Sequence, residues 1–270
     1  MVVDDAELAV AAAAAGASVV REHYGTELAR FEKAPGDFAT EADLAAEEAI
    51  LGVLRAARPG DSFVGEESGR NAGGRGEREW FVDPLCGTLN YAVNTMLVSV
   101  NVALRDGRRI VAAASADPFA GEVFWTDGEV ARVRETNGQP ESGDKRLQPD
   151  GNSGIVDLNL DPPFLNAPRF RAARLLLDDR FVARFKPRVV SSTLAVAWVA
   201  AGRRAAYVTD GELLDSVHFA AGIGLCQAAG CVVTALDGGP LHSGSQGLVA
   251  AADPDTHSAL LEMVAAQLSG

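Results

Sequence analysis

The chain has 270 residues, 47% of them hydrophobic and 23% charged, which is typical of a globular protein and excludes a mostly disordered chain. Its formal net charge is −13, so we expect no nucleic-acid partner bound through overall charge. The apolar stretch from Leu8 to Val20 is too short for a membrane span and follows acidic residues, unlike a signal peptide. Three cysteines give no disulfide framework, which favours a cytoplasmic protein.

The first half of the chain combines two helices with several short strands. Apolar residues at helical spacing predict a helix over residues 5–29, and Thr40–Asp43 (T-E-A-D) resembles a capping box that begins a second helix. The Asp106-Gly107 and Asp127-Gly128 pairs predict hairpins. Short apolar runs predict strands over residues 62–64, 80–82, 97–104, 110–116 and 122–125.

A polar segment rich in Gly, Pro, Asn and Asp follows, from Thr136 to Gly154. It predicts a boundary between an N-terminal half, residues 1–140, and a C-terminal half, residues 150–270. Helices and strands mix without strict alternation, which favours layered α/β or α+β sheets over a barrel. The second half predicts strands over residues 153–158, 205–209, 231–235 and 247–251, and helices over 193–201, 217–229 and from 256.

Two motifs carry acidic residues at the ends of predicted strands. The first is G-E-E-S, from Gly65 to Ser68, and the second is W-F-V-D-P-L-C-G-T-L-N-Y, from Trp80 to Tyr91. Carboxylates at strand ends can converge on a hard cation through oxygen ligands. Glu66 and Asp83 are therefore candidate metal ligands, although turn and cap roles account for them equally well.

These motifs, together with D-F-A-T-E-A-D at Asp37–Asp43 and a late A-A-G followed by G-C-V-V, occur in the order seen in the inositol monophosphatase family. The chain resembles that family along nearly its whole length. The resemblance implies an α/β fold, the inositol monophosphatase-like α/β/α/β sandwich, and Mg²⁺-dependent sugar-phosphate hydrolysis. It also implies a first metal site at Glu66, Asp83 and the carbonyl of Leu85, with Asp43 and Thr88 positioning the water.

Two aspartates that hold the family's second metal are replaced here. Cys86 stands at the fourth residue of the family's D-P-I-D-G-T motif, and His218 stands at the Asp of its W-D-x-A-A-G motif. Because the two family residues contact one ion, we expect Cys86 and His218 to lie within a few ångströms of each other. Losing two oxygen ligands should cripple a hard Mg²⁺ site, which disfavours ordinary two-metal phosphate hydrolysis.

Three interpretations of the Cys86–His218 pair remain open. Cys86 can be a nucleophile with His218 as its general base. Alternatively, both can join Asp83 or Glu66 in binding Zn²⁺ or another transition ion. In the third interpretation the site is inactive and the protein is a scaffold.

A Cys–His pair normally needs a third group that orients the imidazole. The candidates are Asp117, at the end of a predicted strand, and Asp215, one helical turn before His218; we favour Asp117 because Asp215 suits a helix cap. His242 is a weaker alternative to His218 as the base.

The favoured hypothesis is a cysteine-dependent cyclase that needs no cofactor. The pattern is similar to the Dieckmann cyclases of bacterial tetramate and pyridone antibiotic pathways. That resemblance implies that Cys86 takes an acyl chain from a carrier-protein thioester and that His218, held by Asp117, removes a proton. Backbone N–H groups of Gly87 and Thr88 would form the oxyanion hole. The alternatives are a metal-dependent phosphatase with an altered Mg or Zn site and an inactive scaffold.

The expected partners follow from the same hypothesis. Basic residues cluster between Arg169 and Arg188, and this segment could dock an acidic acyl or peptidyl carrier protein. The alternative interpretation of this segment is a solvent-exposed helix face without a binding role. The family resemblance also implies a possible homodimer, and we expect no membrane partner.

Overall fold

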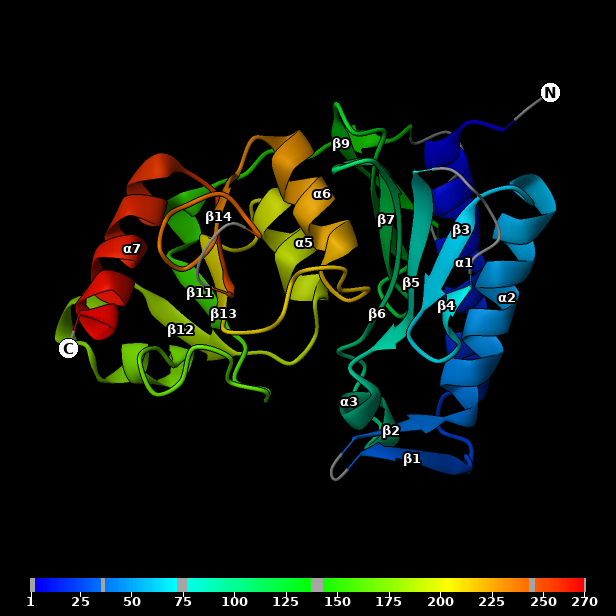
Figure 1. Ribbon diagram of the computed structural model, residues 1–270, viewed down its shortest axis with the longest axis horizontal. Coiled ribbons are helices and arrows are strands. Elements are labelled where there is room, and N and C mark those ends of the chain that lie inside the picture. Colours follow the sequence, from blue (N-terminus) through cyan, green and yellow to red (C-terminus); the bar gives the residue numbers. More distant parts are fainter. Residues whose placement is uncertain (1–2, 35–36, 72–76, 137–142, 243–245, 270) are drawn as a thin grey trace. The chain divides into compact units, whose positions relative to one another are not determined.

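The computed structural model describes residues 3–34, 37–71, 77–136, 143–242 and 246–269, which fold into two compact units (Figure 1). The first unit comprises Met1–Arg146, Ser192–Leu194 and Val217–Leu225, and the second comprises Leu147–Ser191, Ala195–Ser216 and Cys226–Gly270. The first crossing between them lies inside the predicted boundary, of which residues 137–142 are outside the described residues. The two short returns to the first unit had no sequence signal.

The first unit is built on an eight-stranded sheet with the order β10-β9-β8-β7-β6-β5-β3-β4. Neighbouring strands are antiparallel except β3 and β5. The unit's elements are α1 (Asp5–His23), β1 (Arg30–Ala34), β2 (Asp37–Thr40), α2 (Glu41–Ala57), β3 (Ser62–Gly65), β4 (Gly69–Asn71), β5 (Arg78–Cys86), α3 (Thr88–Ala92), β6 (Ser99–Asp106), β7 (Arg109–Asp117), β8 (Glu122–Thr126), β9 (Ala131–Glu135) and β10 (Lys145–Arg146).

Helices α1 and α2 cover one face of this sheet (Figure 1). The predicted capping box begins α2. The Thr40 side chain accepts a hydrogen bond from the backbone N–H of Asp43, and the Asp43 carboxylate accepts one from the backbone N–H of Thr40. The buried residues of both helices pack against alternate residues of the central strands, such as Val82 and Val102. This alternation leaves the next residues of each strand, including Phe81 and Asp83, for the opposite face.

The second unit contains a mixed five-stranded sheet with the order β12-β11-β13-β15-β14. Strands β12, β11 and β13 are parallel, and β15 and β14 are antiparallel to their neighbours. Helix α7 closes a core with β11, β13 and β15. The elements of the rest of the chain are η1 (Gly151–Ser153), β11 (Ile155–Leu158), η2 (Ala172–Leu177), α4 (Asp179–Arg184), β12 (Lys186–Val189), α5 (Leu194–Ala200), β13 (Ala206–Thr209), α6 (Ala220–Ala229), β14 (Val232–Thr234), β15 (Leu248–Ala251) and α7 (Pro254–Leu268). Leu194 of α5 and the part of α6 up to Leu225 belong to the first unit.

The layered α/β class predicted from the sequence is confirmed. Two predicted helices differ in length: the first ends at His23, and the predicted helix over residues 217–229 begins only at Ala220. Because α6 starts later, His218 lies in the turn before the helix, and the direction of its side chain is not fixed by helical geometry. Over the described ranges, no helix combines the length and apolar character that crossing a membrane requires.

Candidate functional site

Asp83 and Cys86 reach the same face of the sheet because β5 is irregular between them. Pro84 has no N–H to give to the strand ladder, and the register against β6 shifts between Asp83 and Cys86. Asp83 then pairs with Asn101, and Cys86 pairs with Ser99. Asn101 and Ser99 are two residues apart and share a face, so their partners share it as well.

Gly87 then turns the chain sharply into α3. Its φ of 105° lies in the left-handed region, which residues with a Cβ rarely adopt. The turn ends β5 directly after Cys86 and places Thr88 at the first position of α3. The sequence D-P-L-C-G-T therefore encodes a bulge followed by a turn, and this local geometry presents the side chains of Asp83, Cys86 and Thr88.

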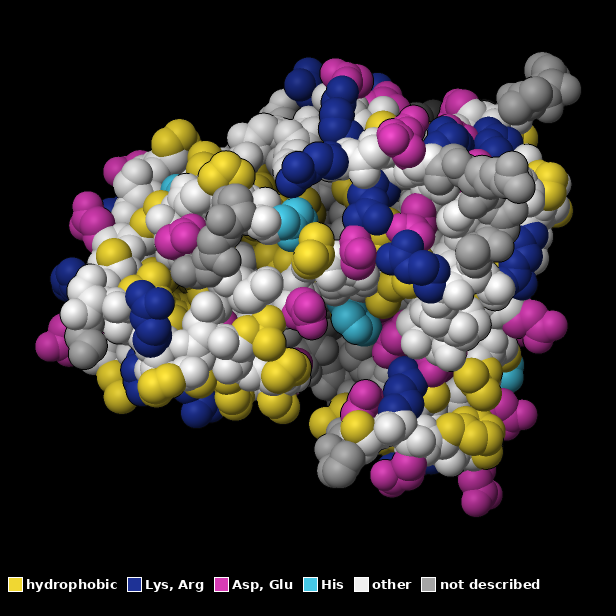
Figure 2. Space-filling view, viewed as in Figure 1, with side chains coloured by type: hydrophobic (Ala, Val, Ile, Leu, Met, Phe, Trp, Pro, Cys, Tyr) yellow, Lys and Arg dark blue, Asp and Glu magenta, His cyan; other side chains and the backbone are white. Residues whose placement is uncertain are grey.

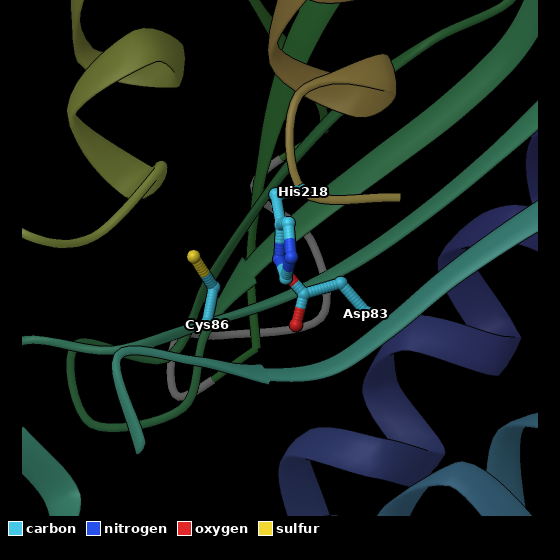
Figure 3. Close-up of side chains that lie close together, drawn as sticks. All are labelled: Asp83, Cys86 and His218. Atoms are coloured by element: carbon cyan, nitrogen blue, oxygen red, sulfur yellow. The ribbon is translucent and has the colours of Figure 1, made fainter. Parts of the chain in front are cut away.

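His218 is held over this face by its apolar neighbours. Val217 and Ala221 pack on a cluster that includes Phe81. The His218 Nδ1 atom lies 2.9 Å from Asp83 Oδ2, and Figure 3 shows the two side chains with Cys86 beside them. Because an ionised carboxylate can only accept a hydrogen bond, the ring donates its Nδ1–H to Asp83, and Cys86 is a second hydrogen-bonding neighbour of the ring.

The charges of the pair stabilise each other. Burial raises the pKa of Asp83, but the neighbouring His218 outweighs it and holds this pKa below its ordinary value. Burial likewise opposes the protonated form of His218, yet the Asp83 carboxylate raises the pKa of His218 well above its ordinary value. In the ion-free protein the two residues therefore form a charged pair at neutral pH.

The Cys86 sulfur accepts two hydrogen bonds from Thr193, one from the backbone N–H at 3.3 Å and one from Oγ1 at 3.0 Å. The Asn101 side-chain amide donates to the same Thr193 hydroxyl, and the Ser115 hydroxyl donates to the Asn101 side-chain oxygen Oδ1. The Thr193 hydroxyl proton is thereby directed to the sulfur. Burial, and next the Asp83 charge, still raise the pKa of the Cys86 thiol.

Asp83, Cys86 and His218 can each offer one ligand atom to the same ion, and the three atoms lie within 4.8 Å of one another (Figure 3). The set combines a carboxylate oxygen, a sulfur and an imidazole nitrogen. The proximity of Cys86 and His218 that the sequence predicted is thus present in the structure. Such mixed O, N and S donors suit zinc and related transition ions better than Mg²⁺.

Glu66 lies next to this group and is held on one side by Lys33. The Lys33 ammonium is 2.9 Å from Glu66 Oε1 and 2.6 Å from Glu67 Oε1. In the described part of the chain, the buried oxygens Glu66 Oε2 and Asp83 Oδ1 have no hydrogen-bond partner. Burial, and next the charge of Asp83, raise the pKa of Glu66 to about 8. Two unpartnered carboxylate oxygens are what a cation would satisfy.

Thr88 connects the D-P-L-C-G-T turn to α2. Its hydroxyl lies 2.9 Å from Asp43 Oδ1 and 3.2 Å from the carbonyl oxygen of Leu85. Asp43 is fully buried, and this burial raises its pKa despite bonds from Thr40 and Thr88. The geometry therefore places Asp43, Thr88 and the Leu85 carbonyl together, as the family resemblance implied.

Asp117 does not occupy the orienting position predicted for it. Its Oδ1 accepts hydrogen bonds from the backbone N–H groups of Phe119 and Ala120 at 2.9 Å, so it shapes its own turn before Pro118. Asp83 provides the carboxylate at His218 Nδ1 instead. The role of His242 as an alternative base stays a prediction.

The comparisons with known proteins agree on one family. The family model described as "Inositol monophosphatase family" matches residues 3–269. The chain belongs to the inositol monophosphatase family. It is 33% identical to the inositol-1-monophosphatase of Caulobacter vibrioides over 89% of this chain and 92% of that protein, and 30% identical to the Nus factor SuhB of Escherichia coli K12 over 97% and 96%. The crystal structure of extragenic suppressor protein suhB from Bartonella henselae superposes with a TM-score of 0.82 and 25% identity, covering 96% and 97%.

Membership in the inositol monophosphatase family contradicts the Dieckmann-type cyclase. Relatives of similar length that match along almost the whole chain are named inositol-1-monophosphatases, which are phosphoric monoester hydrolases. The cyclase prediction rested on two substituted residues, whereas the family match rests on the entire fold. The predicted tetramate or pyridone product is wrong together with the cyclase, whereas the oxyanion role of Gly87 and Thr88 stays a prediction.

The expectation that no cofactor is needed is contradicted as well, because inositol monophosphatases are metal-dependent enzymes. The residues present fit a cation on two grounds. Glu66 Oε2 and Asp83 Oδ1 are buried without a hydrogen-bond partner in the described residues. The donors at Asp83, Cys86 and His218 also converge within 4.8 Å.

The basic segment of the second unit does not decide the question of a partner. Several of its arginines already have partners: Arg180 pairs with Asp178, and Arg184 pairs with Asp255. Hydrophobic side chains also lie on the surface of the second unit (Figure 2), and Leu177 is the most exposed of those in this segment. The carrier-protein and homodimer expectations stay predictions.

Proposed function

We propose that this protein hydrolyses a phosphate monoester of an inositol or a related polyol, with a zinc-class divalent ion held by Asp83, Cys86 and His218. The observation that carries the proposal is the convergence of their three ligand atoms within 4.8 Å. Two relatives named inositol-1-monophosphatase support the substrate class. The donor types support a softer ion than Mg²⁺.

The residues divide the task of holding the ion. Asp83 would bind through Oδ1, which is buried without a partner among the described residues, while Oδ2 keeps the His218 ring in place through Nδ1–H. His218 would bind through Nε2, and Cys86 as a thiolate. Glu66 Oε2 and the Leu85 carbonyl oxygen would be the further oxygen ligands available to a cation at this site.

A bound divalent ion polarises phosphoryl oxygens and makes water a better nucleophile at neutral pH. Residues of the chain would accept the proton that the attacking water releases. The Thr88 hydroxyl, which donates to Asp43, can accept a proton from a water while passing its own to the carboxylate. The burial that raises the pKa of Asp43 favours its taking up that proton. Lys33 keeps Glu66 and Glu67 in place by its two ion pairs.

The location that fits this proposal is the reducing cytoplasm. Cys86, Cys226 and Cys231 are all free thiols. A thiolate ligand has to remain reduced to bind a metal, and disulfides are rare in that compartment.

The test measures metal content and phosphate release on the same variants. Protein stripped with a chelator is resupplied with Zn²⁺, Mn²⁺ or Mg²⁺ and assayed with inositol 1-phosphate. We expect one firmly bound zinc-class ion per chain and hydrolysis that needs it. Cys86→Ala and His218→Ala should lose both, whereas Cys231→Ala, a free thiol outside the site, should keep both.

Two outcomes contradict the proposal. One is ion binding by Cys86→Ala and His218→Ala that equals binding by the wild type. The other is a lack of ion-dependent phosphate release by a wild-type protein that is folded. Iodoacetamide provides a further check, because bound zinc should protect Cys86 from alkylation.

A further inference from the structure

Glu47 is a buried acidic residue for which the proposed chemistry has no direct use. It lies on α2, and only 3% of its surface is exposed. Its Oε2 accepts the backbone N–H of Glu67 at 2.8 Å, and its Oε1 accepts the backbone N–H of Ser68 at 2.8 Å. Both carboxylate oxygens thus hold the turn that directly follows Glu66.

Gly65 shows how closely this contact is built. A Cβ at Gly65 would lie 2.5 Å from Glu47 Oε2 and 2.6 Å from Oε1, which is closer than real Cβ contacts. The Glu47 carboxylate therefore fills the space beside Gly65, and any other residue at position 65 would displace it. Glu66 stands between Gly65 and the two bonded amides, so Glu47 restrains the chain on both sides of it.

Helix α2 also contacts the D-P-L-C-G-T turn, through Asp43, one helical turn before Glu47. Asp43 accepts the Thr88 hydroxyl, and Glu47, four residues later, holds the Glu66 turn. Residues four apart lie on one face of a helix. Helix α2 thereby sets the spacing between the G-E-E-S turn and the D-P-L-C-G-T turn.

We infer that Glu47 is a positioning residue, which fixes the Glu66 carboxylate beside Asp83 by holding the amides of Glu67 and Ser68. The inference rests on the proposed function insofar as Glu66 serves the ion. Charge-assisted bonds to both amides are stronger than neutral ones and allow little rotation of the turn. Outer residues that orient metal ligands typically contribute about 10–100-fold to metal affinity.

The test uses Glu47→Gln, whose amide can accept from one backbone N–H but sets an NH₂ group against the other. Gly65→Ala disturbs the same contact from the opposite side and serves if Glu47→Gln fails to fold. The matched controls lie on α2: Glu48→Gln changes an exposed acid, and Gly52→Ala adds a Cβ that meets nothing within 4 Å.

The test measures amide hydrogen exchange and zinc affinity. A residue with a purely structural role would not change both of them. In ion-free protein, hydrogen exchange of the Glu67 and Ser68 amides should accelerate about tenfold or more in Glu47→Gln and Gly65→Ala, but not in the controls. In a zinc titration, the dissociation constant should rise about 10–100-fold in the same two variants. Exchange or zinc affinity equal to wild type in a folded Glu47→Gln would overturn the inference.

Failure of the proposed function is distinguishable from failure of this inference. A wild-type protein that binds no ion contradicts the proposed function, while the exchange measurement still tests the hold of Glu47 on the turn. A wild-type protein that binds zinc, with unchanged exchange in both variants, contradicts only the role of Glu47.

Discussion

The His218 Nδ1 atom and the Asp83 Oδ2 atom lie 2.9 Å apart although 135 residues separate them in the chain. This contact decides the direction of the imidazole ring. It also explains why burial does not neutralise either group, because each charge compensates the other.

The first prediction concerns the pKa of His218 in chelator-treated protein. Asp83→Asn keeps the size of the side chain but removes its negative charge, so the main cause that raises the pKa of His218 disappears. The pKa of His218 should fall, toward or below its ordinary value, because burial then acts with less opposition. NMR titration of the imidazole Cε1–H resonances measures it.

His257 provides an internal reference in the same spectra. It is buried in the second unit, and burial lowers its pKa. Its titration should be the same in wild type and Asp83→Asn. A His218 titration that is also the same in the two proteins would show that the Asp83 contact is absent in solution.

The second prediction restores the family's oxygen ligands. The double variant Cys86→Asp/His218→Asp replaces sulfur and imidazole by carboxylates, which Mg²⁺ prefers. Hydrolysis of inositol 1-phosphate supported by Mg²⁺ should rise about tenfold or more above wild type, and activity with Zn²⁺ should fall. Single variants should gain less, because each leaves one soft ligand.

Steady-state rates at a series of Mg²⁺ and Zn²⁺ concentrations check this exchange of metal preference. A double variant that folds and still shows no response to Mg²⁺ would indicate that more than these two ligands separates this chain from its Mg²⁺-dependent relatives.

The third prediction concerns two glycines in neighbouring helices. A Cβ at Gly16 on α1 would lie 2.6 Å from the buried Ile50 side chain and 3.0 Å from Val100, so Gly16→Ala should destabilise by about 1–3 kcal/mol. Gly52→Ala, in open space on α2, should stabilise by about 0.5–1 kcal/mol. Urea denaturation of the two variants measures both free energies, and effects of equal sign would contradict the packing described for α1 and α2.

The fourth prediction concerns stability in acid. Arg134 pairs with Glu7 at 2.7 Å and with Asp144 at 2.7 Å, and its hydrogen bonds hold the pKa of both acids below their ordinary values. An acid whose pKa is lowered in the folded state stabilises the fold at pH values above its ordinary pKa. This stabilisation is lost as the pH falls through the lowered pKa. The stabilisation should therefore be present at pH 7 and disappear below about pH 4.

Arg134→Met removes both ion pairs while retaining much of the side-chain volume. Because the pairs are partly exposed, the variant should be less stable than wild type by only about 1 kcal/mol at pH 7. The difference should shrink toward zero at pH 3. Urea denaturation at the two pH values measures it, and a difference that persists unchanged at pH 3 would assign it to packing of the Arg134 stem instead.

Local sequence patterns predicted the parts of the site that are built locally. The capping box at Thr40 and the D-P-L-C-G-T turn have chain-neighbour partners, and both are readable from residue types. The proximity of Cys86 and His218 followed from the family resemblance. Asp117 stands before Pro118 in a D-P-F-A sequence, which is typical of a turn, and in the structure its side chain accepts hydrogen bonds within that turn.

The missed residues act through contacts across the fold. Lys33 reaches Glu66 from a hairpin that the sequence did not predict, and Thr193 reaches Cys86 from a segment 107 residues away. Glu47 looks like one of several acids on an amphipathic helix until its partners are known. Such pairings depend on tertiary packing, which a single sequence does not specify.

The bulge at Pro84 has a consequence for any attempt to redesign this protein. Side chains three positions apart on an even strand point in opposite directions, and the extra residue in β5 reverses one of them. Removing one residue between positions 83 and 86 would therefore turn one of the two side chains toward the hydrophobic core that lies under α1 and α2. Chemical variety at this position depends on a fixed count of residues.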